Sequence, residues 1–285
     1  MIIIKSSLFS SQVKVSLIVT TKNHEKFIDE CLASLETFPD GTPIILNDVN
    51  SSDGTGLALT SFAMKKENVI INTFKEDLTQ LEILKFSLKT VFTPFVICIS
   101  GDDAFNRDYK NFILSYKMNA KSAVFGAILI CDENMKHIRV KSSKWNHSQS
   151  KNRLKLLISN PANSQGAILP TEQVRKILNL SDLPKTLIED YWLWWKLVDK
   201  VQFIATDTIF VNYRRHPKAL SYQSKNSSYV SSLGFSTGIA YNQARGILEK
   251  FASIILIIRW GRHAHLCKIR DFIVGFRRAR DCDFV

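Results

Sequence analysis

The segment FVICISGDDAF, residues 95–105, decides the fold that this sequence predicts. A run of apolar, β-favouring residues ends abruptly at Ser100 and Gly101, and two adjacent carboxylates, Asp102 and Asp103, follow. This pattern predicts a buried strand that carries two acids at its carboxyl end, which is the edge where open α/β sheets bind ligands. Paired carboxylates need a neutralising cation, and Mg²⁺ or Mn²⁺ takes such oxygen ligands and often shares them with a phosphate. The segment therefore indicates a metal-bridged phosphate site, with a solvated turn or a helix cap as the alternative role of the two acids.

The residues before this segment predict alternating strands and helices. Strands are expected at residues 13–20, 44–46 and 69–74, and helices at residues 56–66 and 79–91. A further helix is expected between the first two strands, and its apolar face consists of Phe27, Ile28, Cys31, Leu32 and Leu35. This βαβαβαβ succession is typical of a mostly parallel sheet that is covered by helices on both faces.

The residues after the segment show a less regular pattern. The polar, basic segment 132–150, with Trp145 in its middle, predicts a surface loop or a mobile flap. Glu189 and Asp190 stand at the start of an aromatic helix that also contains Trp192, Trp194 and Trp195. The other expected elements are a helix at 109–120, a strand at 123–130 that could pair antiparallel near an edge, a helix from about Thr171, and strands at 201–204 and 208–211.

Length and composition limit the class of protein. The chain has 285 residues, of which 45% are hydrophobic, and its net charge of +12 indicates an anionic partner such as a phosphorylated substrate, a membrane leaflet or nucleic acid. The five cysteines are scattered and form no CxxC pair, which argues against a disulfide framework and a zinc site. We find neither a signal segment nor an apolar run long enough to span a membrane, so we expect a cytoplasmic protein.

Three parts are expected along the chain. Residues 13–222 form the main α/β domain, the Ser- and Asn-rich residues 223–235 form a linker, and residues 236–285 form a helical tail. Apolar residues recur in the tail at helical spacing between arginines and lysines, which predicts a basic amphipathic helical extension. Such a tail could lie on the anionic cytoplasmic face of a membrane or could pack on the main domain or a second copy of it.

Three acidic motifs lie where such a sheet would expose them on one edge: Asp48 with Asp53, Asp102 with Asp103, and Glu189 with Asp190. Their order and local sequence resemble the family 2 glycosyltransferases of the GT-A fold, a Rossmann-like α/β fold, over residues 13–221. The resemblance implies that Asp48 contacts the base or ribose of a nucleotide. It also implies that Asp102, more than Asp103, binds the metal, and that Asp190 is the catalytic base.

This chain departs from the family pattern at several positions. Val49 stands where a second Asp is usual, Asn50 where Gly is usual, and Ser100 where the metal motif begins with an acid. The Arg-Asn pair that often precedes the metal strand is absent from residues 81–91. The candidate substrate-binding residues are Thr20, Asp48, Asp53, Glu189, Trp194, Arg214 and Arg215, and the candidate metal ligands are Asp102, Asp103 and His216.

The resemblance implies sugar transfer from a nucleotide-sugar donor, most simply a UDP-sugar, to a hydroxyl of a glycan acceptor. Mn²⁺ or Mg²⁺ would neutralise charge on the departing diphosphate, and Asp190 would take the proton of the acceptor hydroxyl. Direct displacement of this kind inverts the anomeric centre. We expect a lipid-linked acceptor in the synthesis of a bacterial surface polysaccharide such as O-antigen or capsule, contact with an anionic membrane, and no nucleic acid.

Structural roles remain alternatives for single residues. Asp48 could close a turn, Asp53 could start a helix, and Glu189 with Asp190 could form an acidic first helical turn. Trp194 could belong to the core, and Arg214 with Arg215 could be solvated.

Three other functions are also considered. A phosphatase of the haloacid dehalogenase kind would need an Asp where Ser51 stands, and a nucleotidyltransferase would need a glycine-rich phosphate loop after the first strand. A non-enzymatic basic module that binds membrane or nucleic acid would leave the acidic motifs unexplained.

Overall fold

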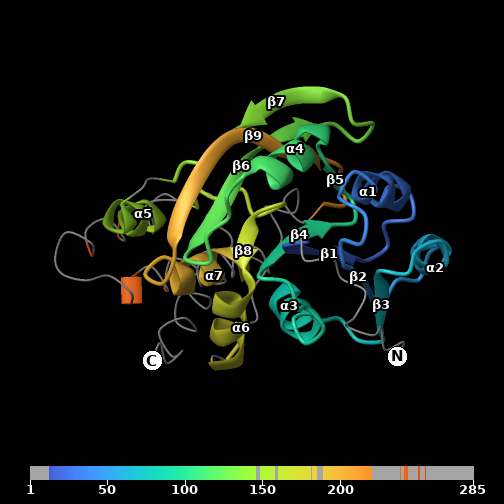
Figure 1. Cartoon of the computed structure of the whole chain (residues 1–285), viewed down its shortest axis with the longest axis horizontal. Coiled ribbons are helices and arrows are strands. Elements are labelled where there is room, and N and C mark those ends of the chain that lie inside the picture. The colour runs from blue at the N-terminus through green and yellow to red at the C-terminus, as the bar shows by residue number, and fades with distance from the viewer. Residues whose placement is uncertain are drawn as a thin grey trace, which may run out of the picture. The chain divides into compact units, whose positions relative to one another are not determined.

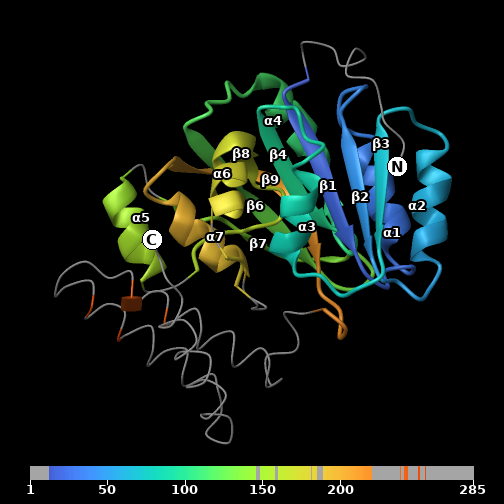
Figure 2. The same cartoon turned by 90° about the horizontal axis from the view of Figure 1, so that it is seen from below.

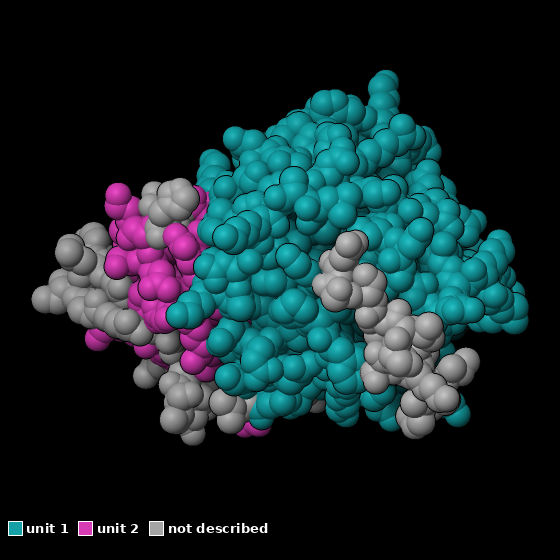
Figure 3. Space-filling model, in the orientation of Figure 1, with its two compact units in different colours: residues 1–144, 163–181, 204–215 teal, residues 145–162, 182–203, 216–285 magenta. Residues whose placement is uncertain are grey.

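A computed structural model describes residues 13–145, 148–157, 160–180, 182–184 and 189–219, together with Gly238, Tyr241, Asn242, Lys250 and Ile254 (Figures 1 and 2). The expected linker lies outside the described residues, and so does the expected tail apart from these five positions. The chain divides into two compact units, coloured separately in Figure 3. Unit 1 consists of residues 1–144, 163–181 and 204–215, and unit 2 of residues 145–162, 182–203 and 216–285.

The first half of the sheet in unit 1 is parallel. Its strands are β1 (Val15–Thr21), β2 (Ile44–Val49), β3 (Val69–Phe74) and β4 (Phe95–Ser100), and they lie in the order β3-β2-β1-β4. Thr20 pairs with Asn47 on one side and with Ser100 on the other, so the carboxyl ends of β1, β2 and β4 are level. The α/β class and the expected parallel strands are confirmed.

The second half of the sheet is antiparallel. Its strands are β5 (Ala104–Phe105), β6 (Ser122–Cys131), β7 (His137–Lys141), β8 (Ile168–Pro170) and β9 (Gln202–Arg214). Among the described residues, all nine strands form one sheet in which the order continues as β4-β8-β6-β9-β5, with β7 paired to β6. The predicted strand at 123–130 is therefore antiparallel, as considered, but it lies inside the sheet.

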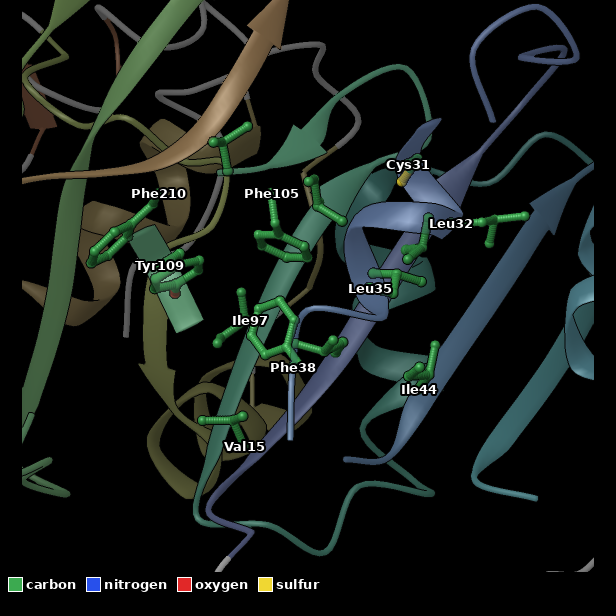
Figure 4. Close-up of a cluster of buried hydrophobic side chains, with 14 of the residues drawn as sticks. Val15, Cys31, Leu32, Leu35, Phe38, Ile44, Ile97, Phe105, Tyr109 and Phe210 are labelled. Carbon is green, nitrogen blue, oxygen red and sulfur yellow. The ribbon is translucent and has the colours of Figure 1, made fainter. Parts of the chain in front are cut away.

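Helices cover both faces of the sheet. The helices of unit 1 are α1 (Ile28–Leu35), α2 (Thr55–Ala63), α3 (Gln80–Ser87), α4 (Arg107–Ser115) and α6 (Thr171–Leu180). Helices α1 and α4 lie on one face, and α3 and α6 lie on the other (Figure 1). Under α1, the cluster in Figure 4 brings Leu35 and Phe38 together with Phe105 and Tyr109, and Tyr109 stacks on Phe210 with ring centroids 4.0 Å apart. The predicted apolar face of α1 is buried throughout.

The prediction of a loop or flap over residues 132–150 is wrong for part of this segment. This segment contains β7 and the beginning of α5 (Gln149–Leu156), and Trp145 is buried against Phe203 in unit 2. All five residues of β7 are exposed. The strand is held in place by its hydrogen bonds to β6 and not by the burial of its side chains. Burial-based pattern recognition therefore missed it.

Two further predictions differ from the structure in detail. The strands expected at 201–204 and 208–211 are one continuous strand, β9, because Ala205, Thr206 and Asp207 between them continue the extended backbone. The helix expected at 109–120 is α4, which begins and ends earlier, at Arg107 and Ser115, and the short strand β5 precedes it. The aromatic helix at Glu189 is present as α7 (Glu189–Leu197) in unit 2.

Candidate functional site

The site in unit 1 is built on the loops that follow β1, β2 and β4. Asp48, near the end of β2, is buried, and its Oδ1 accepts a hydrogen bond of 3.2 Å from the backbone N–H of Ser51. This contact closes the turn after β2. Asp48 therefore has the structural role of closing a turn. It also lies at the edge of the sheet where α/β proteins bind ligands.

The loops after β1 and β2 are bound to each other. Asn23 Oδ1 accepts a hydrogen bond of 2.8 Å from the backbone of Ser52, and the Asn23 N–H donates to Ser51 Oγ. Both Asn23 and Asn50 have positive φ angles, 54° and 55°. Asparagine tolerates this left-handed conformation better than most residues, which explains how Asn50 can stand where the family usually has Gly.

Asp53 serves the same loop. Its carboxylate accepts hydrogen bonds from the backbone and hydroxyl of Thr55 and from the backbone of Glu25. Desolvation works to raise the pKa of Asp53, but these hydrogen bonds outweigh it and hold the pKa below its usual value. The contacts support the structural role of Asp53 at the start of α2.

Asp102 and Asp103 have different surroundings. The Asp102 side chain is 14% exposed, and its Oδ2 lies 4.0 Å from Nε2 of His24. Asp103 is 2% exposed and accepts a hydrogen bond of 2.8 Å from the backbone N–H of Arg214. Burial, and next the neighbouring Asp102, raise the pKa of Asp103 well above its usual value, although Arg214 works against this.

Gly101 fits the motif tightly against β1. A Cβ atom at this position would lie 2.6 Å from Oγ1 of Thr21 and 3.0 Å from Ile28. Only glycine allows the chain to pass this close, so Gly101 fixes the distance between the Asp102 turn and the first strand.

The residues present fit a shared divalent metal better than a protein-only metal site. Among the described residues, no group of three or more His, Cys, Asp and Glu side chains is arranged to hold a metal ion. Mg²⁺ and related ions, however, commonly keep several waters and bind one or two carboxylates together with substrate phosphates. Asp102 suits that role, whereas the buried Asp103 with its raised pKa suits it less.

The basic residues expected at the end of β9 lie in different surroundings. Arg214 is buried, and its guanidinium donates to Glu133, Glu30 and the backbone carbonyl of Asp102. Arg215 has an exposed side chain, and its backbone N–H donates to Cys131. His216 is buried and belongs to unit 2.

Unit 2 contains the acids of α7. Asp190 Oδ2 accepts a hydrogen bond of 3.1 Å from Nδ2 of Asn160, and Oδ1 accepts one of 2.8 Å from the backbone of Tyr191. Glu189 is buried, and Trp194 is 2% exposed with its ring edge-on to Phe203. This burial supports a core role for Trp194 more than stacking on a sugar.

Sequence reasoning did not single out three residues that support the acids. His24 approaches Asp102, Asn160 binds Asp190, and Gln165 Oε1 accepts a hydrogen bond of 3.0 Å from the backbone of Ser100 at the end of β4. His24 stands directly after the first strand, and that position was its only signal. Asn160 and Gln165 lie in a short polar segment that shows no motif of its own.

No helix that the structure describes combines the length and the apolar character that a membrane span requires.

Comparison with solved structures shows the fold. The S. aureus TarS fragment 1–349 in complex with UDP-GlcNAc is similar with a TM-score of 0.61 and 17% identity, covering 89% of this chain and 73% of that one. The mannosyltransferase PcManGT from Pyrobaculum calidifontis, in complex with GDP-Man and Mn²⁺, has a TM-score of 0.59 and 16% identity over 93% and 74% of the two chains. A search of the curated proteins finds no match.

The family follows from the sequence. The profile of glycosyl transferase family 2 matches residues 16–169, which include β1, β4 and both acidic motifs of unit 1. This match spans more than half of the chain, and so the protein belongs to glycosyl transferase family 2.

Proposed function

We propose that this glycosyltransferase moves a sugar from a nucleotide-sugar donor, a UDP-sugar in the first instance, to a hydroxyl of a glycan acceptor with inversion at the anomeric carbon. The observation that carries the proposal is the acidic edge of unit 1. Asp48 lies near the end of β2 and Asp102 follows β4, the two parallel strands on either side of β1, at the edge where such sheets bind nucleotides. The structural neighbours include complexes with UDP-GlcNAc, UDP and GDP-Man, which is consistent with a nucleotide-sugar donor.

The chemical roles are divided among a few side chains. Asp102 would hold Mn²⁺ or Mg²⁺, which when bound supplies positive charge to the leaving diphosphate. Asp48 would contact the nucleoside, and the exposed Arg215 would contact the diphosphate. Asp190 would accept the proton of the acceptor hydroxyl. His216 would be a second metal ligand, and Glu189 the alternative base.

The acceptor is proposed from the charge of the chain. A net charge of +12 suits a protein that works beside anionic lipid, and a glycan on a lipid diphosphate would present its hydroxyl at that surface. We therefore place the enzyme in the cytoplasm, peripheral to the inner membrane, in the synthesis of a bacterial surface polysaccharide.

A screen of nucleotide sugars tests the donor. The full chain would be mixed with UDP- and GDP-sugars in the presence of MnCl₂, and thermal stabilisation and hydrolysis of the donor would be measured. We expect one donor class to stabilise the wild type and to lose this effect with EDTA and in Asp102→Asn. Asp108→Asn is the matched control, because Asp108 is an exposed acid on α4. Equal stabilisation with and without EDTA would exclude the metal role of Asp102.

A further inference from the structure

Arg214 lies behind the acidic motif as a buried charge. It is the last residue of β9, it is 3% exposed, and its guanidinium lies 4.6 Å from the ring centroid of Phe27. A buried guanidinium is costly unless its N–H groups find acceptors. The hydrogen-bond acceptors of the Arg214 guanidinium indicate the role of this residue.

Two of the hydrogen bonds of Arg214 hold the motif itself. Nε donates to the backbone carbonyl of Asp102 at 2.8 Å, and the backbone N–H donates to Oδ1 of Asp103 at 2.8 Å. The first bond fixes the peptide after Asp102, and the second fixes the side chain of Asp103. On its other side the same turn packs closely against the side chain of Thr21, where Gly101 leaves no room for a Cβ atom. The backbone that carries the Asp102 carboxylate is therefore restrained from both sides.

The rest of the guanidinium is bound to two other elements. Nη1 donates to the backbone carbonyl of Glu133 at 2.5 Å, in the turn between β6 and β7, and Nη2 pairs with the carboxylate of Glu30 on α1. Glu133 in turn accepts from Lys26 at 2.5 Å. One planar side chain thus joins the acidic turn to α1 and to the β6–β7 turn, and all three of its nitrogens donate to the protein.

We propose that Arg214 is a positioning residue that holds the Asp102–Asp103 turn in the geometry that metal and diphosphate binding require, and that it does not contact the diphosphate itself. The inference rests on the proposed function, and it replaces the expectation that Arg214 binds substrate. Lysine could not take over this task. Its single ammonium group lacks the fork that reaches Asp102, Glu133 and Glu30 at once.

The hydrogen bonds by which Arg214 holds the Asp102–Asp103 turn, here called the clamp, are tested first without any ligand. Arg214→Lys would be compared with the wild type and with Arg139→Lys, a control at an exposed arginine of β7. Hydrogen exchange of the backbone amides at residues 100–106 is measured by mass spectrometry, together with the melting temperature. We expect faster exchange in this segment for Arg214→Lys only. Unchanged exchange there would overturn the clamp. If Arg214→Lys does not fold, Glu30→Gln takes its place, because it removes the charge of one partner and keeps an acceptor.

The second measurement separates positioning from direct contact. Calorimetry with UDP is carried out in MnCl₂ and in EDTA. We expect Arg214→Lys to weaken the apparent Mn²⁺ affinity of the UDP-bound chain by about tenfold, as for other residues that orient metal ligands, and to leave UDP affinity in EDTA unchanged. A loss of UDP affinity in EDTA would make Arg214 a diphosphate ligand and overturn the inference. A wild type that binds neither UDP nor GDP would contradict the proposed function, while the exchange measurement would still decide whether the clamp exists.

Discussion

The carboxylate of Asp190 is engaged at both oxygens. Oδ2 accepts from the side chain of Asn160, and Oδ1 accepts from the backbone of Tyr191. Hydrogen bonds at both oxygens hold the carboxylate in one orientation, which suits a base that must be aimed at one acceptor hydroxyl. An amide at this position keeps the size of the side chain and one of the two acceptor oxygens.

We therefore expect Asp190→Asn to fold and to bind donor like the wild type, and to turn over at least about a hundredfold more slowly because the amide has no basicity. Turnover is measured with the donor that the screen identifies, and donor binding by calorimetry. Glu189→Gln is the comparison variant, since Glu189 is the neighbouring buried acid. If Asp190→Asn retained activity and Glu189→Gln lost it, the base would be Glu189.

The lowered pKa of Asp53 makes a prediction about pH. A carboxyl whose pKa is lower in the folded chain than the ordinary 3.8 stabilises the fold above that value, and the stabilisation is lost as the pH falls through the folded pKa. We expect Asp53→Asn to melt at a slightly lower temperature than the wild type at pH 7, and the difference to shrink below about pH 4. Melting curves across this range test it. A difference that is constant with pH would show that ionisation of Asp53 contributes nothing.

At the scale of elements, helix α3 shows how a local sequence signal fixes a boundary. Thr79 Oγ1 accepts from the backbone of Glu82, and the Glu82 carboxylate accepts from the backbone of Thr79, so the two residues form a capping box. We expect Thr79→Ala to lower the free energy of unfolding by about 1 kcal/mol. Chemical denaturation measures this value. Thr60→Ala, at an exposed threonine inside α2, is the control and should have little effect.

The parallel half of the fold could be predicted because each of its elements leaves a local pattern. Buried strands such as β1 and β4 are continuous apolar runs, and α1 has a buried face at helical spacing. In the antiparallel half, β6 left the same kind of apolar pattern, but two other features did not. Strand β7 is exposed on every residue, and the middle of β9 is only partly buried, so both depend on pairing with other strands of the sheet.

At the scale of the whole molecule, the acidic motifs could be located from the sequence, whereas the contacts that hold them in place could not. The strand that precedes Gly101 and Asp102 can be recognised in the sequence, because the change from apolar to acidic residues is local. The clamp by Arg214 joins residues more than a hundred positions apart, and nothing near Arg214 in the sequence indicates it. Positive φ at Asn50 likewise became visible only in the folded loop.

The last prediction concerns the tail, residues 236–285, which lies outside the described residues apart from five positions. Its apolar residues recur at helical spacing among Arg259, Arg262, Lys268, Arg270, Arg277, Arg278 and Arg280. Apolar burial at the lipid interface and attraction to anionic headgroups would act together, and the second contribution is screened by salt. We expect the full chain to float with liposomes that contain anionic lipid, less so at high salt, and a chain truncated at Leu233 to remain unbound.

Neutral liposomes are the control for charge, and the melting curve of the truncated chain is the control for folding. A tail that binds the membrane leaves the catalytic domain folded when it is removed, because its apolar face was turned to lipid and not to protein. If the tail packs on the catalytic domain instead, its removal exposes the apolar surface beneath it and unfolds the domain. If the full chain ignores anionic liposomes and truncation unfolds it, the apolar stripe belongs to the protein core, and the net charge of +12 must serve the phosphorylated substrates instead.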